Sequence, residues 1–245
     1  MKIAVLISGQ SRFTREFDDF LDNIEDYDQL DFFFYIWTAR HEDNMLIPRT
    51  WPVSADDVRA RIVKNLPPKS NLVELVVTDP PAYTPPDWIQ PNPWTAPFNV
   101  WNNYYALKQV NMLREQHGPY DMVIRTRGDV GIRSKLNLRS VNQFIQANLN
   151  TIITPDNFRH GVGFALNDMI AFGSSAAMSV YCNAIDYFEQ YHKQGLHYHA
   201  ETLLGQHLKV NGINYPLTGI EQIKNEYQSP LGLPCPDVVD YGRWA

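Results

Sequence analysis

The chain opens with Lys2-Ile-Ala-Val-Leu-Ile7, an apolar run that is followed by Ser8-Gly-Gln-Ser-Arg12. A run of this length that ends in a Gly-containing turn is typical of a strand buried on both faces. The next apolar positions recur with the spacing of one helix face: Phe13, Phe17, Phe20, Leu21 and Ile24. A second apolar run, Asp31-Phe-Phe-Phe-Tyr-Ile-Trp37, follows them. Two buried strands joined by a helix favour parallel pairing and an α/β fold.

The remaining patterns extend this alternation of strands and helices. Ser54-Ala-Asp-Asp57 resembles a capping box, and we expect it to start a helix that ends before Pro67-Pro68. The other expected elements are strands at 71–78, 122–127, 151–154 and 168–172, and helices at 100–116, from Ser174 through Phe188, and at 200–210. We therefore predict one α/β domain over residues 1–245, with a mostly parallel Rossmann-type central sheet flanked by helices.

Two segments fit no regular element. Residues 79–98 contain seven prolines, too many lost backbone donors for a helix or a central strand, so we expect a stiff loop. Several large aromatic side chains lie in or just after this loop: Trp88, Trp94, Phe98 and Trp101. They predict either a lid that stacks on a sugar or side chains that pin the loop to the surface. The Pro- and Gly-spaced tail at 229–245 is expected to wrap the surface.

Composition narrows the class of protein. The formal charge is −6 and no basic run interrupts it, which argues against nucleic acid or an anionic membrane as partner. No stretch reaches the roughly 20 apolar residues of a membrane span. The two cysteines, Cys182 and Cys235, match neither a disulfide framework nor a zinc motif, so we expect free thiols. A soluble cytoplasmic protein is the prediction.

The strand and turn Met122-Val-Ile-Arg-Thr-Arg-Gly-Asp-Val130 hold the densest set of reactive side chains. Side chains alternate along a strand, so Arg125 and Arg127 share one face, and Asp129 follows at the matching offset after Gly128. Two guanidinium groups suit a diphosphate, and Asp129 suits a divalent cation, Mn²⁺ or Mg²⁺, that bridges its oxygens. A structural Arg-Asp ion pair that fixes the turn is the alternative.

Several blocks in succession resemble a GT-A-type glycosyltransferase group from polysaccharide and glycan assembly. The blocks that carry the resemblance begin at Ile3, Asp31, Tyr120, Asn167 and Ala200, and they span most of the chain in the same order. The resemblance implies a GT-A fold and a nucleotide-sugar donor across the C-terminal edge of the sheet, with the first loop near the nucleotide. That loop supplies Ser8, Gly9, Gln10 and Arg12, and backbone amides before a helix form a natural anion site.

One feature departs from that group. GT-A enzymes often carry an Asp-x-Asp metal motif at this strand end, whereas Arg127-Gly-Asp129 retains only the second carboxylate. A cation at Asp129 would need donor phosphates, water and another protein ligand. Alternatively, Arg127 neutralises the diphosphate and no metal is required.

Two further acidic residues are candidates for catalysis. Glu201 opens the expected helix at 200–210, where such enzymes often offer an acidic residue to the acceptor hydroxyl, so we assign it as general base. Asp168 is expected to contact the donor sugar or the acceptor, with turn capping as the alternative. His197, His199 and His207 lack the partners of a zinc site, so we read them as surface or core residues, with Mn²⁺ or phosphate binding near Glu201 as the alternative.

These residues predict a glycosyltransferase that moves a sugar from a nucleotide-diphosphate sugar to a hydroxyl acceptor, such as a glycan. A sugar nucleotidyltransferase is a second interpretation, although its first loop is usually longer and richer in Gly, Lys and Arg. A non-catalytic nucleotide- or glycan-binding protein of the same fold is a third, since one carboxylate is missing. Hydrolase and phosphate-loop motifs are absent from the sequence.

Overall fold

A central sheet organises the chain in the computed structural model, which describes residues 1–11, 15–38, 54–89, 96–132, 135–154, 158–160, 163–166, 168–215 and 239–240. The six strands of this sheet are, from edge to edge, β4 (Ser70–Thr78), β3 (Gln29–Trp37), β1 (Lys2–Gln10), β5 (Met122–Thr126), β11 (Ala171–Gly173) and β8 (Ile152–Ile153). The first four are parallel, whereas β11 runs antiparallel to both β5 and β8. The predicted α/β fold with a mostly parallel sheet flanked by helices is confirmed.

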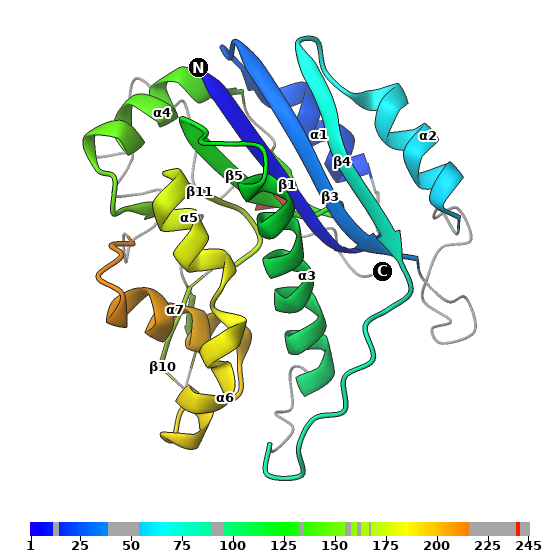
Figure 1. The fold of residues 1–245 in the computed structure, drawn as a ribbon. Coiled ribbons are helices and arrows are strands. Elements are labelled where there is room, and N and C mark those ends of the chain that lie inside the picture. Colours follow the sequence, from blue (N-terminus) through cyan, green and yellow to red (C-terminus); the bar gives the residue numbers. More distant parts are fainter. Residues whose placement is uncertain are drawn as a thin grey trace.

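Helices cover both faces of the sheet (Figure 1). They are α1 (Arg15–Asn23), α2 (Ala55–Asn65), α3 (Pro97–Glu115), α4 (Leu138–Ala147), α5 (Ser175–Cys182), α6 (Ile185–Lys193) and α7 (Ala200–Val210). Ile3, Val5 and Ile7 of β1 face α1, α2 and α4, whereas Ala4 and Leu6 face α3, α5, α6 and α7. Since β1 is buried on both faces, its apolar run is continuous rather than alternating.

Three small two-stranded pairings lie outside the main sheet. β2 (Ile24–Glu25) pairs with β7 (Leu136–Asn137) in parallel. The antiparallel pairs are β9 (Phe158–His160) with β10 (Gly163–Ala165), and β6 (Gly131–Ile132) with β12 (Val239–Asp240). The last of these connects the turn after β5 to a segment near the end of the chain.

The strand order creates a topological switch point between β1 and β5. The chain passes from β1 outward to β3 and β4, and then returns through α3 to place β5 on the other side of β1. In open α/β sheets, ligands bind outside the carboxyl ends of the strands at such a switch point. The carboxyl ends of β1 and β5 carry Ser8–Gln10 and Arg125–Arg127, which are the residues that the sequence singled out.

The first strand is longer than predicted. Ser8, Gly9 and Gln10 continue β1 instead of forming a turn, because they pair with Tyr35, Ile36 and Trp37 of β3. Gly9 has a φ of 114°, a conformation that residues with a side chain rarely adopt. The strand therefore extends beyond its last pairing with β5, which lies at Ile7.

Three other expected boundaries were also wrong. Helix α3 begins at Pro97, inside the expected loop, because a proline at the first helical position loses no intrahelical hydrogen bond. The helix expected from Ser174 through Phe188 is divided into α5 and α6 by a turn at Asn183. Asp168 precedes β11 by three positions instead of opening the strand.

Other local predictions are confirmed. Ser54 caps α2, since its hydroxyl oxygen accepts from the Asp57 backbone N–H at 3.1 Å. Gly118 has the expected positive φ of 94°, and α7 spans the expected residues. Cys182 is a buried free thiol. Among the helices of the described segments, none is long and apolar enough to cross a membrane. Arg12, Trp94, Cys235 and most of the 229–245 tail lie outside the described residues.

Candidate functional site

Arg125 is the most unusual residue at the switch point. Its position on β5, two residues after Val123, directs it to the α3 side of the sheet, and its exposure is only 2%. Within the described residues, its Nε and Nη1 atoms have no hydrogen-bond partner. Burying a charged group whose hydrogen bonds are incomplete costs about 1–3 kcal/mol or more, so such residues are seldom retained for stability alone.

Other buried polar atoms without hydrogen bonds lie near the same edge. Ser8 Oγ at the end of β1 and Asn102 Oδ1 on α3 have no partner among the described residues, although both residues are at least nine-tenths buried. A Cβ placed on Gly9 would lie 3.5 Å from Asn103 Oδ1, so the N-terminal part of α3 approaches the end of β1. Thr126 Oγ1 is also unpartnered in the described chain and lies on the opposite face of β5.

Arg127 and Asp129 form a closed ion pair. The Arg127 Nε donates to Asp129 Oδ1 at 2.8 Å, and Nη2 donates to Oδ2 at 2.6 Å. Burial acts to lower the pKa of Arg127, but the Asp129 carboxylate, followed by Asp168 and Glu201, outweighs it and raises that pKa. The side chains of Arg127 and Asp129 are 25% and 16% exposed, so this pair is more accessible than Arg125.

Asp168 is held from two helices on the same side of the sheet. The Tyr104 hydroxyl of α3 donates to Asp168 Oδ2 at 3.0 Å, and the Tyr181 hydroxyl of α5 donates to the Asp168 backbone oxygen at 3.3 Å. Both tyrosines are fully buried. Since Asp168 precedes β11, these two bonds fix a residue that no strand or helix positions.

Glu201 stands in the first turn of α7. Its backbone oxygen accepts from the Leu166 N–H at 3.4 Å, and its Oε2 lies 3.2 Å from His199 Nε2. Burial and then the Asp168 charge raise the pKa of Glu201 to about 8, while Arg127 and Arg125 act to lower it. Glu201 therefore interacts electrostatically with Asp168 and with both arginines.

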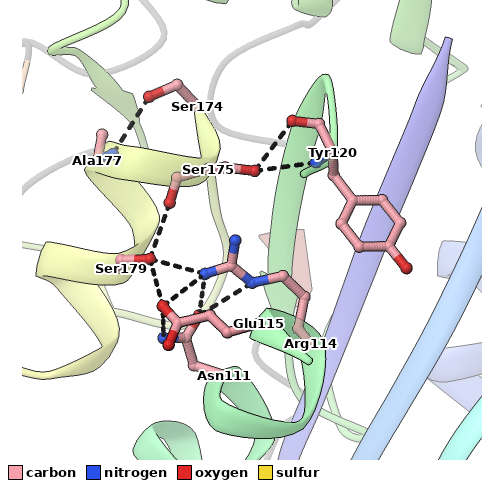
Figure 2. Close-up of polar contacts among 8 residues, drawn as sticks. All are labelled: Asn111, Arg114, Glu115, Tyr120, Ser174, Ser175, Ala177 and Ser179. Carbon is pink, nitrogen blue, oxygen red and sulfur yellow. Dashed lines mark hydrogen bonds and ion pairs between the residues drawn. The ribbon is translucent and has the colours of Figure 1, made fainter. Parts of the chain in front are cut away.

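A separate polar network joins the far end of α3 to α5 (Figure 2). The guanidinium of Arg114, which is 3% exposed, donates to Asn111 Oδ1 at 2.6 Å and to Ser179 Oγ at 2.7 Å. It also pairs with Glu115 at 3.1 Å. Ser175 at the start of α5 bonds both the N–H and the carbonyl oxygen of Tyr120. The network fixes the two helices that carry Tyr104 and Tyr181.

Asp129, the residue expected to hold a cation, is paired with Arg127 in the structure. Both oxygens of Asp129 already accept from Arg127, so a cation would first have to displace the guanidinium. In the part of the chain that the structure describes, no three His, Cys, Asp or Glu residues are grouped as metal ligands. His207 is buried and bonds the Val180 backbone oxygen at 3.1 Å, as expected of a core histidine.

The aromatic residues after β4 stack on one another. Trp101 lies between Tyr83 and Tyr105, with ring centroids 4.5 Å and 4.7 Å away. Trp88 stacks on His192 and lies under Lys193 Nζ at 4.6 Å. These contacts favour the interpretation that the aromatic side chains pin the loop to the surface.

Sequence reasoning missed Tyr104, Tyr181 and Asn102 as site residues. Both tyrosines occupy apolar-stripe positions of their helices, where an aromatic residue indicates core packing. Their hydroxyl groups become relevant only once Asp168 is known to lie beside them, which no spacing in the sequence indicates.

Comparisons with known proteins assign neither a family nor a function to the chain. Neither a family model nor a curated protein matches the chain. Function is therefore inferred from the geometry of the site.

Proposed function

We propose that the protein is a glycosyltransferase that transfers a sugar from a nucleotide-diphosphate sugar to a hydroxyl acceptor, such as a glycan. One observation carries the proposal: Arg125, buried and lacking hydrogen bonds at two of its nitrogen atoms within the described chain, lies at the switch point beside a pair of carboxyl groups. An anionic ligand would offset the cost of this charge, and the switch point is where such folds bind nucleotides.

The arginines support recognition of the diphosphate. Arg127 is partly exposed at the strand end and presents a planar guanidinium, which suits phosphate oxygens. Arg125 lies deeper and adds positive charge where the diphosphate would leave. Ser8 and Asn102 supply polar atoms that have no partner among the described residues, and these atoms suit the nucleotide or the sugar, in the region that we assign to the donor together with Gly9 and Gln10.

The carboxyl groups support proton transfer. In the proposed reaction the acceptor oxygen bonds the anomeric carbon, the bond from that carbon to the phosphate oxygen breaks, and Glu201 takes the acceptor proton. The raised pKa of Glu201 makes it a strong base once it is deprotonated. Asp168, held by the Tyr104 hydroxyl, would orient a sugar hydroxyl.

The negative charge of the leaving diphosphate can be neutralised in two ways. We favour neutralisation by Arg125 and Arg127 without a metal, because Asp129 is already paired with Arg127 through both oxygens. The second route opens this pair and lets Asp129 hold Mn²⁺ or Mg²⁺ together with the phosphates. The two routes differ in their dependence on an added cation.

A thermal-shift screen tests the proposal. The panel contains UDP, GDP, CMP and TDP with their sugars, each with and without Mn²⁺, since a ligand of the folded state raises the melting temperature. Any positive nucleotide sugar is then tested for transfer and hydrolysis. The proposal is wrong if no member of the panel binds or reacts.

Matched variants localise the binding. Arg127→Met should remove the thermal shift, whereas Arg139→Met should retain it, because Arg139 pairs with Asp26 and Asp28 away from the switch point. Equal loss in both variants would refute binding at this site.

A second candidate is a protein that binds nucleotide sugars without reaction. The Arg127–Asp129 pair favours it, because Arg127 already occupies the carboxylate that a metal would need. That candidate predicts a thermal shift with the same ligands but no loss of donor over prolonged incubation. Turnover that Glu201→Gln abolishes would exclude it.

A further inference from the structure

Phe98, in the first turn of α3, has an exposed aromatic ring. Its side chain is 46% exposed, and no other ring of the described chain stacks on it. Trp101, by contrast, is enclosed between the rings of Tyr83 and Tyr105, and Trp88 is stacked as well. Phe98 therefore keeps a ring face available to a ligand, whereas Trp88 and Trp101 hold the preceding loop in place.

Asn102 lies four positions after Phe98, so the two residues share one face of α3. Asn102 is 9% exposed, and its Oδ1 atom is buried without a hydrogen-bond partner in the described part of the chain. An acceptor left in this way costs free energy that an N–H or O–H group of a ligand would recover. The shared face thus combines an exposed ring with an unsatisfied acceptor.

This face lies at the carboxyl edge of the sheet, on the β3 side of the switch point. A Cβ placed on Gly9 would lie 3.5 Å from Asn103 Oδ1, so this part of α3 approaches the end of β1. Three positions after Asn102, the Tyr105 ring contacts Tyr35 of β3, with centroids 6.3 Å apart. The helix face that carries Asn102 is therefore turned towards β3.

A different side of α3 faces the carboxyl group of Asp168, since the Tyr104 hydroxyl donates to its Oδ2 atom at 3.0 Å. Asp168 precedes β11, and the strand order β3, β1, β5, β11 places Arg125 of β5 between the two regions. Phe98 and Asn102 thus lie across the switch point from Asp168.

We propose that Phe98 and Asn102 form a subsite for a ring that has an apolar face and a hydrogen-bond donor on its edge. Phe98 stacks on the face, and Asn102 Oδ1 accepts from the edge. A nucleobase with its N–H groups and a pyranose with its hydroxyl groups share this chemistry. Only the link from this ring to a diphosphate at Arg125 rests on the proposed function.

Ligand-observed saturation-transfer NMR on the full chain tests the subsite. One arm contains uridine, thymidine, guanosine, cytidine and adenosine, and the other contains methyl glucoside and methyl galactoside, so the arms distinguish a base from a sugar. Phe98→Ala should weaken binding of the ring about tenfold, because the stacking contact is lost. Phe98→Tyr retains an aromatic ring and should retain the affinity.

Asn102→Leu tests the acceptor separately. It should weaken binding about fivefold without lowering the urea midpoint, because an apolar side chain of similar size replaces an unpartnered buried amide. Met112→Ala is the matched control for Phe98→Ala, since Met112 is 45% exposed near the other end of the same helix. It should leave the affinity unchanged. A lower urea midpoint in Asn102→Leu would show a structural amide and overturn the role of Asn102.

Three results overturn the subsite as a whole: neither class of ring binds, Phe98→Ala leaves the affinity unchanged, or Met112→Ala lowers it equally. A nucleoside diphosphate whose binding needs Arg127 but is unaffected by Phe98→Ala and Asn102→Leu would remove the subsite and leave the proposed function. Ring binding that depends on Phe98, with no nucleotide sugar bound, would remove the proposed function and leave the subsite.

Discussion

Replacing Glu201 by Gln should stabilise the protein in a pH-dependent way. Folding raises the pKa of this carboxyl group from 4.5 to about 8, because it is partly buried and lies near the Asp168 charge. The folded chain then binds the proton more tightly than the unfolded chain, so the stability of the wild type falls as the pH rises between these two values. Since one pKa unit corresponds to about 1.36 kcal/mol, the unfolding free energy of the wild type falls by roughly 5 kcal/mol at alkaline pH.

Gln carries no proton to lose, so the variant does not share this decline. We expect Glu201→Gln and the wild type to differ little at about pH 4.5 and the variant to be more stable by several kcal/mol, roughly, near pH 9. Urea unfolding followed by circular dichroism at several pH values measures the difference. Glu25→Gln is the control, because Glu25 is a glutamate on the exposed face of β2.

A difference between Glu201→Gln and the wild type that stays constant from acidic to alkaline pH would refute the reasoning. It would mean that Glu201 reaches solvent in the folded chain and does not share a buried environment with Asp168. The assignment of Glu201 as a base with a raised pKa would then also fail.

Three other variants distinguish residues that act in ligand binding or turnover from residues that stabilise the fold. Arg125→Met should change the unfolding free energy by no more than about 1 kcal/mol at mildly acidic pH. It should weaken binding of a nucleoside diphosphate, measured by calorimetry, at least about tenfold. A loss of roughly 3–5 kcal/mol in unfolding free energy would instead show a structural ion pair. Arg114→Met should cost about 3 kcal/mol in urea unfolding without changing that affinity, because Asn111 and Ser179 lose a buried donor. Turnover should persist in EDTA and in Asp129→Asn; abolition by both would indicate the metal route.

The sequence predicted the sheet because its strands are continuous apolar runs. A run such as 31–37 is long enough for a buried strand, and helix stripes between the runs indicate parallel pairing. The direction of β11 was not predictable in this way, since a three-residue strand carries no pattern that distinguishes parallel from antiparallel pairing. The length of β1 was also missed, because Ser8–Gln10 is a turn by composition and a strand only through its pairing with β3.

The candidate site was predicted as a group of residue types and not as a set of contacts. Strand alternation correctly placed Arg125 and Arg127 at one strand end. The alternative of an Arg-Asp ion pair at the turn was stated, but the sequence did not indicate which arginine would form it. Arg127 closes on Asp129 while Arg125 keeps unpaired nitrogen atoms within the described chain, and that choice depends on the turn after β5. The hydroxyl of Tyr104 was hidden for a similar reason, since its ring accounts for the helix stripe by itself.

The opposite edge of the sheet supplies an internal comparison for the buried charges. Asp31, near the start of β3, is also a buried carboxylate, with 4% of its side chain exposed. It accepts hydrogen bonds from Asn71 and Gln29, each at 2.8 Å, and from Tyr120 at 3.0 Å, and it pairs with Lys2 at 3.2 Å. Burial opposes its ionisation, but these partners outweigh burial and lower the pKa of Asp31.

The two edges of the sheet therefore differ in how many polar partners surround a buried charge. At the N-terminal edge, the polar partners of Asp31 compensate its charge, as expected where a charge serves stability. At the C-terminal edge, Arg125 keeps unpaired donors among the described residues and Glu201 has a raised pKa, although Asp168 and two arginines lie in the same cluster. Because this sheet can satisfy a buried charge, the Arg125 donors left unpaired within the described residues support the proposal of a ligand that completes the site.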